Sequence, residues 1–187
     1  MVFFMKESGD IGSFYHYAFP MQAVLVTCKD KKMGKTNVIT IAWHTPISKK
    51  PPLYGISVAP SRYSHGLIEQ SGEFVVNFAS YDLVDKVAFC GKHSGRNIDK
   101  IKELGLSILD SQVLDTPILK DCFAHLECRL FEKRVIGDHS FFIGEIVNIL
   151  YDKDCFSRDV LNNDLVHPCF YLGDNLYTKI DKTREEY

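Results

Sequence analysis

The sequence predicts a mainly β protein built around a small closed antiparallel barrel with a few short helices. Three observations support this fold class. Seven or eight stretches have strand-like residue types, the segments between them are too short for the crossovers of a parallel sheet, and only three stretches have helical spacing. The 187 residues, 45% of them apolar, can bury a sizeable core without metals or disulfides. We expect one domain over residues 1–187, with an N-terminal extension at 1–13 and a polar tail at 181–187.

The first half of the chain contains four predicted strands and three predicted helices. The strands cover residues 23–28, 38–43, 53–58 and 74–78, and the helices cover residues 65–70, 83–90 and 98–104. A polar, charged stretch closed by Gly34 predicts a hairpin turn between the first two strands. Asp82 is the candidate N-cap of the second helix, and Gly105 ends the third.

The second half is predicted to be mostly β. Residues 123–135 and 141–151 are long strands, and residues 170–180 form a strand pair broken by the hairpin signal at 173–175. In the first of these strands, apolar and polar residues alternate, so we expect them on opposite faces. The apolar set is Ala124, Leu126, Cys128 and Leu130, and the polar set is His125, Glu127 and Arg129.

Composition and missing motifs exclude several functions. A net charge of −2 without a basic stripe argues against nucleic-acid binding, and no apolar run is long enough to span a membrane. At the N-terminus the charges follow a short apolar run, the wrong order for a signal peptide, so we expect a cytoplasmic protein. The six cysteines contain no C-x-x-C pair and are expected to be free thiols, and we assign no residue to a metal. The sequence also has no G-x-G-x-x-G, G-x-x-x-x-G-K-[ST], H-E-x-x-H or G-x-S-x-G motif.

The run of residues 37–52 places polar side chains among strand residues and ends in a double proline. Its polar positions are Asn37, Thr40 and Ser48, while Trp43 ends the first strand. One interpretation is an amphipathic hairpin with Trp43 as a core anchor. The functional interpretation is a strand edge whose backbone groups meet a flat polar ring.

The turn at residues 61–64 carries hydroxyl groups and an arginine just before a predicted helix. Arg62 can donate two hydrogen bonds to a phosphate, and Ser64 can either cap the helix or donate to the same anion. The N–H groups of a helix N-terminus also favour anions. The alternative interpretation is an exposed turn with a helix cap.

The stretch C-G-K-H-S-G-R-N-I-D-K at residues 90–100 has two glycines, Gly91 and Gly95, which permit a turn that a side chain would strain. Donor groups gather around this turn: Ser94, Arg96 and Lys100. One interpretation is a connector between two helices. The alternative is a positively charged loop that covers an anionic ligand.

His139 lies in a G-D-H turn that leads into the strand F-F-I-G-E-I. A histidine at this position is often an ordinary turn residue. The functional interpretation is contact with a redox cofactor or its electron donor, because histidine titrates near neutral pH.

Five stretches occur together in an order that closely resembles the flavin reductase-like family, whose members include flavoredoxins and archaeal-type ferric reductases. They are P-M-Q-A-V-L-V-T, N-V-I-T-I-A-W-H-T-P-I-S-K-K-P-P, G-E-F-V-V-N, F-C-G-K-H-S-G-R-N-I-D-K and G-D-H-S-F-F-I-G-E-I, within residues 19–177. The resemblance implies a split β-barrel with a Greek-key core, one FMN per subunit, and a homodimer with the flavin near its interface. It also implies electron transfer through the flavin, from NADH or NADPH or a protein donor to an acceptor.

The resemblance further implies roles for individual residues. The family's contacts to the flavin ring and ribityl chain correspond to Asn37, Thr40, Trp43 and Ser48. The family's phosphate-side turn corresponds to Arg62, Tyr63 and Ser64, and a strand end beside the flavin corresponds to Asn77. The family's loop near the cofactor corresponds to Ser94, Gly95 and Lys100. His139 matches the family histidine that lies beside the nicotinamide in reductases, which implies a catalytic role. Where many relatives have Thr-x-x-Ile, this chain has His65-Gly66, which shifts the phosphate contact toward Arg62 and backbone amides.

Three hypotheses follow. The first is an FMN-dependent reductase that uses NADH or NADPH, the second is an FMN-binding electron carrier without nicotinamide activity, and the third is a split-barrel binding module without flavin. The sequence leaves open the choice between NADH and NADPH. It also leaves open the acceptor, which could be free flavin, a ferric chelate or a redox partner protein.

Overall fold

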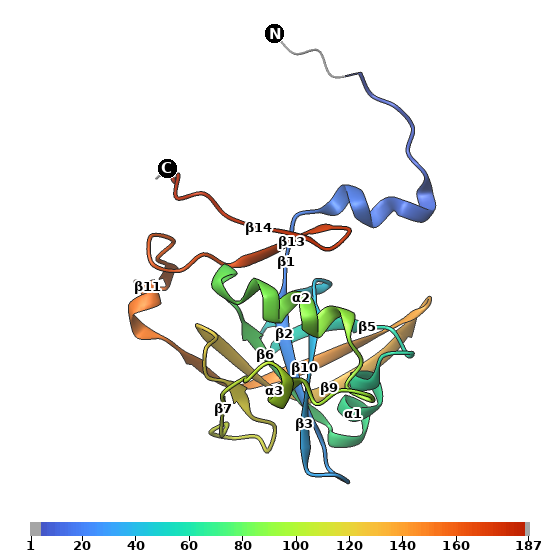
Figure 1. Ribbon diagram of the computed structural model, residues 1–187, viewed down its shortest axis with the longest axis vertical. Helices are drawn as coiled ribbons and strands as arrows, with labels where there is room; N and C mark the ends of the chain where they lie inside the picture. The colour runs from blue at the N-terminus through green and yellow to red at the C-terminus, as the bar shows by residue number, and fades with distance from the viewer. Residues whose placement is uncertain (1–4, 186–187) are drawn as a thin grey trace.

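The structure, a computed structural model, describes residues 5–185 (Figure 1). Residues 1–4 of the predicted extension and residues 186–187 of the predicted tail lie outside the described residues. The strands are β1 (Met21–Gln22), β2 (Val24–Asp30), β3 (Lys35–Ile41), β4 (His44–Lys49), β5 (Pro52–Val58), β6 (Glu73–Phe78), β7 (Ile108–Leu109), β8 (Ile118–Leu119), β9 (Ala124–Ile136), β10 (His139–Tyr151), β11 (Phe156–Ser157), β12 (Val160–Leu161), β13 (Cys169–Gly173) and β14 (Leu176–Lys179). The helices are α1 (Tyr63–Ser71), α2 (Val84–Lys92) and α3 (Lys100–Glu103), with 3-10 turns η1 (Ile11–Ala18), η2 (Tyr81–Leu83) and η3 (Lys153–Cys155).

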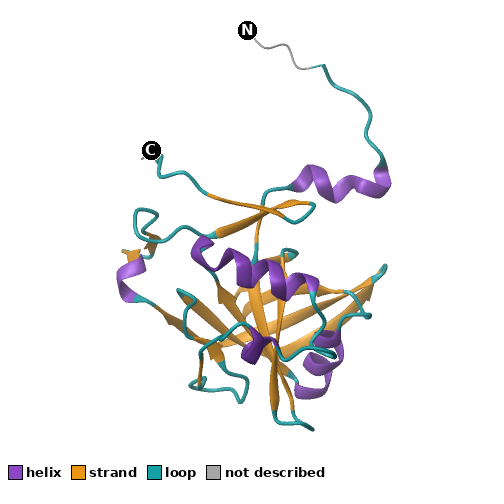
Figure 2. Ribbon diagram, viewed as in Figure 1, coloured by secondary structure: helices purple, strands orange, loops and turns teal. Residues whose placement is uncertain are grey.

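Seven antiparallel strands form the main sheet in the order β3-β2-β6-β9-β10-β5-β4. The two edge strands, β3 and β4, are consecutive in the chain and are separated only by Ala42 and Trp43. The carbonyl of Trp43 accepts a 2.9 Å hydrogen bond from the N–H of Ser57 in β5. The bend at residues 42–43 therefore joins the two edges of the sheet and closes the barrel on that side. The mainly β, antiparallel split barrel expected from the sequence is confirmed, and Figure 2 shows the short helices around it.

The barrel is filled by apolar side chains that strands β2, β5, β6 and β10 point inward. Val26, Ile56, Phe74 and Phe142 are almost completely buried there, and Ile68 of α1 packs against them. At about 25 cal/mol per Å² of apolar surface removed from water, such packing is the main force that holds α1 on the sheet. It therefore also fixes where the N-terminus of α1 lies.

A second apolar cluster lies on the other face of β2 and β3, beneath α2 and α3. Val87 and Cys90 of α2 pack on Leu25 and Val38, and Leu119 completes this layer. A separate three-stranded sheet, β1-β13-β14, lies beside it. Asp174 and Asn175 have positive φ at the β13–β14 turn, as the predicted hairpin requires.

Some details differ from the sequence predictions or add to them. On the polar face of β9, His125 and Glu127 are buried and Arg129 is exposed, and the segment at residues 106–119 contacts Glu127. Glu127 accepts hydrogen bonds from three backbone N–H groups of that segment, at residues 112–114, over 2.9 to 3.1 Å. Asp82 is not the cap of α2, which begins after Leu83. The stretch after Trp43 forms the additional strand β4. Within residues 5–185 the six cysteines are free thiols, five of them buried.

Candidate functional site

Two adjoining cavities follow β3 and the turn before α1. One has a volume of about 300 Å³ and lies between residues 39–43, the end of β5 and His139. The other has a volume of about 160 Å³ and lies between Asn37, residues 61–64 and residues 90–96. Four residues line both, Ile39, Ser61, Arg62 and Gly91, so we treat the pair as one feature and call it the polar cleft.

The N-terminus of α1 opens into this cleft. Arg62 occupies the N-cap position with extended backbone angles, and its side chain does not cap the helix. A hydrogen bond of 3.0 Å from the Arg62 N–H to the Ala59 carbonyl shapes the turn that presents Ser61 and Arg62. Within residues 5–185 the Arg62 guanidinium has no hydrogen bond or ion pair. A free guanidinium beside a helix N-terminus is an arrangement that binds phosphate.

Asn37 and Ser64 form the floor of the smaller cavity. The Asn37 Nδ2 donates to the Ser64 Oγ over 2.7 Å, and both side chains are buried. The other end of the Asn37 amide faces the backbone of Gly95. A Cβ atom at position 95 would overlap the Asn37 Oδ1. The predicted need for glycine is therefore steric at Gly95, whereas Gly91 lies within α2, where a Cβ would make only ordinary contacts.

Lys100 places a buried cation behind the cleft. Its side chain is only 4% exposed, and its Nζ donates to the carbonyls of Val38 (2.7 Å) and Cys90 (2.8 Å). No carboxylate lies within ion-pair distance of it in the part of the chain that the structure describes. Burial lowers the pKa of the Lys100 ammonium, because nothing negative compensates its desolvation. An anion in the cleft would supply that compensation.

Arg96 and Tyr63 fix the rim of the cleft. The Arg96 Nη1 donates to the Ser61 carbonyl over 3.1 Å, and its guanidinium lies 5.6 Å from the centre of the Tyr63 ring. The Tyr63 hydroxyl donates to Asp30 over 2.8 Å, which raises the pKa of Tyr63 and lowers that of Asp30. The Ser94 Oγ accepts from the Arg96 N–H over 3.3 Å. The loop at residues 94–96 is thereby attached to the turn before α1.

The far end of the cleft is aromatic. The rings of Trp43 and His139 are 5.0 Å apart and inclined by 37°. The His139 Nδ1 lies 2.7 Å from the carboxylate of Asp138, and this contact lowers the pKa of Asp138. Thr40 lines the same cavity, but its hydroxyl donates to the Val87 carbonyl of α2 over 2.6 Å.

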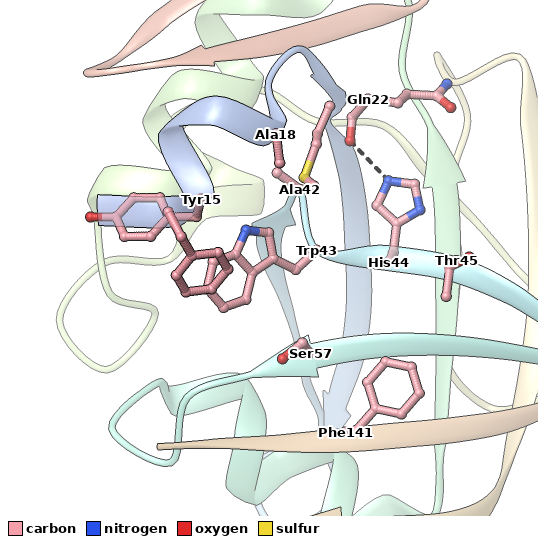
Figure 3. A pocket seen from close by; sticks show the side chains of 11 residues that line it. Tyr15, Ala18, Gln22, Ala42, Trp43, His44, Thr45, Ser57 and Phe141 are labelled. Carbon is pink, nitrogen blue, oxygen red and sulfur yellow. Dashed lines mark hydrogen bonds between the residues drawn. The ribbon is translucent and has the colours of Figure 1, made fainter. Parts of the chain in front are cut away.

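A third cavity, of about 450 Å³, continues beyond Trp43 (Figure 3). It shares Ala42, Trp43 and Ser57 with the polar cleft. We call it the aromatic cavity, because its walls include Phe14, Tyr15, Trp43 and Phe141. The two features therefore adjoin, with cationic side chains in the lining of the polar cleft and aromatic ones in the lining of the aromatic cavity.

Of the residues singled out in the sequence, the structure brings ten together along the polar cleft: Asn37, Thr40, Trp43, Arg62, Tyr63, Ser64, Ser94, Gly95, Lys100 and His139. It does not bring two others there. Ser48 lies on the exposed strand β4, where its Oγ accepts from the Lys50 N–H over 3.2 Å. Asn77 is completely buried, and both ends of its amide are bonded to other parts of the protein.

Sequence reasoning missed several lining residues. Ser57 has no local signal, since it is one alternating residue within a strand. Tyr15 comes just after the predicted extension at residues 1–13. Its only sequence signal is the aromatic run F-Y-H-Y at residues 14–17. Among residues 5–185, none of the helices has the length and apolar character needed to cross a membrane.

Comparison with known proteins places this geometry in a family. The sequence model of the flavin reductase like domain matches residues 16–173. An uncharacterized protein of Archaeoglobus fulgidus is 34% identical over 172 residues, covering 90% of this chain and 94% of that protein. A protein of Agrobacterium fabrum named FMN reductase (NADH) SmoA is 28% identical over 122 residues, covering 64% of this chain and 66% of its own length.

Solved structures show the same fold. The FMN-binding protein of Thermus thermophilus with bound p-hydroxybenzaldehyde has 26% identity and a TM-score of 0.83, with 100% of both chains covered. The flavoredoxin of Desulfovibrio vulgaris (Miyazaki F) has 25% identity and a TM-score of 0.85, with 97% of both chains covered.

Proposed function

The chain belongs to the flavin reductase-like family, and we propose that it is an FMN-binding oxidoreductase that passes electrons from NADH or NADPH to an acceptor. The acceptor would be free flavin, a ferric chelate or a redox partner protein. One observation carries the proposal: the polar cleft has the unpaired Arg62 guanidinium and the N-terminus of α1 at one end and the rings of Trp43 and His139 at the other. FMN has the complementary shape and charge, a dianionic phosphate at one end and a flat ring system at the other.

The phosphate of FMN would lie at the N-terminus of α1. Arg62 has a free guanidinium there, and Tyr63 and Ser64, the first residues of the helix, line the same space. The buried ammonium of Lys100, which donates two of its three N–H groups to carbonyls, adds positive potential behind the phosphate. Micromolar affinity requires roughly 8 kcal/mol of binding free energy. Charge-assisted hydrogen bonds of about 1.5–3 kcal/mol each, together with burial of the ring, are sufficient for that.

The ring of FMN would lie beside Trp43 and His139. Their side chains line the larger cavity of the cleft, which Arg96 and Lys100 do not line, and their flat rings suit an aromatic system. When bound, the flavin supplies the redox chemistry, because it accepts two electrons from a nicotinamide and releases them singly or in pairs. The chain's own contribution is to orient the ring, to exclude water and to place hydrogen-bond donors near developing negative charge.

His139 is the residue that we propose for contact with the nicotinamide. Its Nδ1 faces the Asp138 carboxylate, which orients the imidazole and leaves Nε2 for a ligand. We predict that His139→Ala slows flavin reduction by about tenfold to a hundredfold while FMN affinity is retained. Stopped-flow absorbance under anaerobic conditions measures this rate, and an unchanged rate would make His139 a turn residue only.

The experiment that tests the function begins with the visible absorption spectrum of the purified protein with and without added FMN. Anaerobic titration with NADH and, separately, with NADPH then follows the flavin band. Bleaching by either nicotinamide supports the reductase. A stable complex with FMN that neither nicotinamide bleaches supports the second candidate, an electron carrier, which the structural likeness to a flavoredoxin favours. A protein that binds no FMN would contradict both.

Two further expectations belong to this proposal. The family resemblance implies a homodimer with the flavin near the interface, and the mass of the FMN complex in solution tests it. A cytoplasmic location, expected from the sequence, would place the protein with its soluble nicotinamide donors and can be checked by cell fractionation.

A further inference from the structure

The aromatic cavity has one wall made by η1, a turn whose side chains are all at least partly exposed. Tyr15 lies on η1, which has no buried residues, and its ring contacts Trp43 edge to face at 5.9 Å. Phe14 of the same turn also lines the cavity, although 63% of its surface is exposed. Figure 1 shows η1 set apart from the barrel at the start of the described chain. The cavity is therefore bounded both by the bend at residues 42–43 and by aromatic side chains of η1.

No charged side chain lines this cavity in the described part of the chain. Its one imidazole is His44, both of whose ring nitrogens have partners. Nδ1 lies 2.6 Å from the Tyr54 hydroxyl, and Nε2 lies 2.8 Å from the Gln22 carbonyl, the contact drawn in Figure 3. Burial lowers the pKa of His44, which keeps the imidazole neutral. A ligand with a formal charge would thus be desolvated without a counter-charge.

Size and wall chemistry together define the kind of ligand. Cavities of about 300 to 1,000 Å³ hold small molecules, and this one, at about 450 Å³, falls in that range. Aromatic side chains in the wall, among them Tyr15, Trp43 and Phe141, favour a flat ring over a puckered one. The cavity meets the polar cleft at Trp43 and Ser57, so its occupant would lie next to the end of the cleft that carries Trp43 and His139.

We propose that the aromatic cavity, whose wall includes Tyr15 and Trp43, is a binding site for a planar, uncharged aromatic acceptor. This inference rests on the proposed function and narrows it to a class of acceptor, of which a quinone is the simplest example. The overall reaction is then balanced: NAD(P)H, one proton and the quinone give NAD(P)⁺ and the hydroquinone, with two electrons transferred. The N-terminal segment supplies one face of the site, so it sets acceptor specificity without contributing to phosphate binding.

The chain contains a built-in reporter for this site. Trp43 is its only tryptophan, so intrinsic tryptophan fluorescence comes from the wall of the cavity itself. Duroquinone is a suitable probe, since it is flat and uncharged and its fully methylated ring does not add to the cysteine thiols. Duroquinone is titrated into the full-length protein freed of flavin, and the Trp43 fluorescence is measured. The result is then independent of whether FMN binds. Equilibrium dialysis of duroquinone against the FMN-saturated protein then measures binding beside the cofactor.

Three variants separate the ring of Tyr15 from other effects. Tyr15→Ala removes the ring, Tyr15→Phe keeps the ring without the hydroxyl, and Tyr17→Ala alters an exposed tyrosine of the same segment that does not line the cavity. We expect saturable quenching of Trp43 by duroquinone in the unaltered protein. Tyr15→Ala should weaken binding by about 2-fold to 10-fold, the value of one aromatic pair, while the other two variants match the unaltered protein.

In steady-state assays, Tyr15→Ala should raise the KM for duroquinone by a similar factor and leave the KM for ferricyanide, a highly charged acceptor, unchanged. Quenching that rises linearly without saturation, equal affinity in Tyr15→Ala, or loss of duroquinone binding when FMN is added would each overturn the site. The last result would mean that the flavin ring itself fills the cavity. Failure to bind FMN at all would contradict the proposed function instead, because the flavin-free titration would still report on the cavity.

Discussion

Two asparagines of the same barrel, Asn77 and Asn37, are buried to a similar degree but have different surroundings. The Asn77 amide nitrogen donates to the Leu25 carbonyl over 3.0 Å, and its oxygen accepts from the Leu119 N–H and contacts His125, both at 2.9 Å. The whole group is sealed in the protein, with no exposed surface.

Asn37 sits at the edge of the polar cleft instead. Its nitrogen donates to Ser64, while the neighbouring Lys100 carries a positive charge that no carboxylate balances within the described residues. Cavities open directly beside this group. The comparison teaches how to separate a structural polar cluster from a binding site. The first has every donor and acceptor matched, whereas the second retains unmatched charge next to an open space.

The largest effect that tests this contrast is the loss of Asn77. Asn77→Ala leaves the Leu119 N–H and the His125 imidazole without their acceptor in a sealed interior, so the free energy of unfolding should fall by on the order of 3 kcal/mol. Urea denaturation measures the loss. FMN affinity of the folded fraction should be unchanged. A stable variant with greatly weakened FMN binding would instead assign Asn77 to the flavin site, as the family resemblance implies.

Low pH should destabilise the same buried cluster around Asn77 and His125. Burial lowers the pKa of His125 from its ordinary 6.5 to about 4. The unfolded chain therefore binds a proton that the folded protein does not, and stability falls as the pH drops from 6.5 toward 4. At about 1.4 kcal/mol per pH unit, the total is on the order of 3 kcal/mol.

The check is the free energy of unfolding of the unaltered protein and of His125→Gln, which retains a donor for Asn77, between about pH 7 and pH 4. The difference between the two proteins should shrink as the pH falls. A difference that stays constant would remove His125 as a source of acid sensitivity.

A smaller effect is expected on the cleft side, at the contact of Gly95 with Asn37. Gly95→Ala would force its methyl group onto the Asn37 Oδ1, which displaces the loop that borders the phosphate end. FMN affinity should fall by several-fold, measured by fluorescence quenching of the flavin. In an Asn37→Ala background, where the obstructing atom is absent, the same change should cost less. Equal losses in both backgrounds would show that the two residues do not interact.

The sequence predicted the strands and the cleft better than it predicted which polar residues are free. Strand periodicity, the hairpin glycines and the order of the motifs located the barrel, because these features depend on local geometry. Asn77 and Ser48 looked equivalent to Asn37, since residue type alone does not reveal whether an amide is already bonded. The roles of His125 and Glu127 depend on residues 106–119 folding over them, a long-range event with no local signal.

The aromatic cavity also could not be predicted from the sequence. Tyr15 and Trp43 are 28 positions apart, counted from their residue numbers, and meet only because the bend at residues 42–43 closes the barrel near η1. No spacing rule within one strand or helix predicts such a pair. Only the folded chain brings the N-terminal segment to the end of the cleft.

The most direct test of the account compares FMN with riboflavin, which lacks the phosphate, in the unaltered protein and in Arg62→Ala. If Arg62 and the N-terminus of α1 hold the phosphate, Arg62→Ala should weaken FMN by about 10-fold to 100-fold and leave riboflavin affinity almost unchanged. Isothermal titration calorimetry under anaerobic conditions gives all four affinities. Equal weakening of both ligands, or no weakening of either, would contradict the claim that this end of the cleft is a phosphate site.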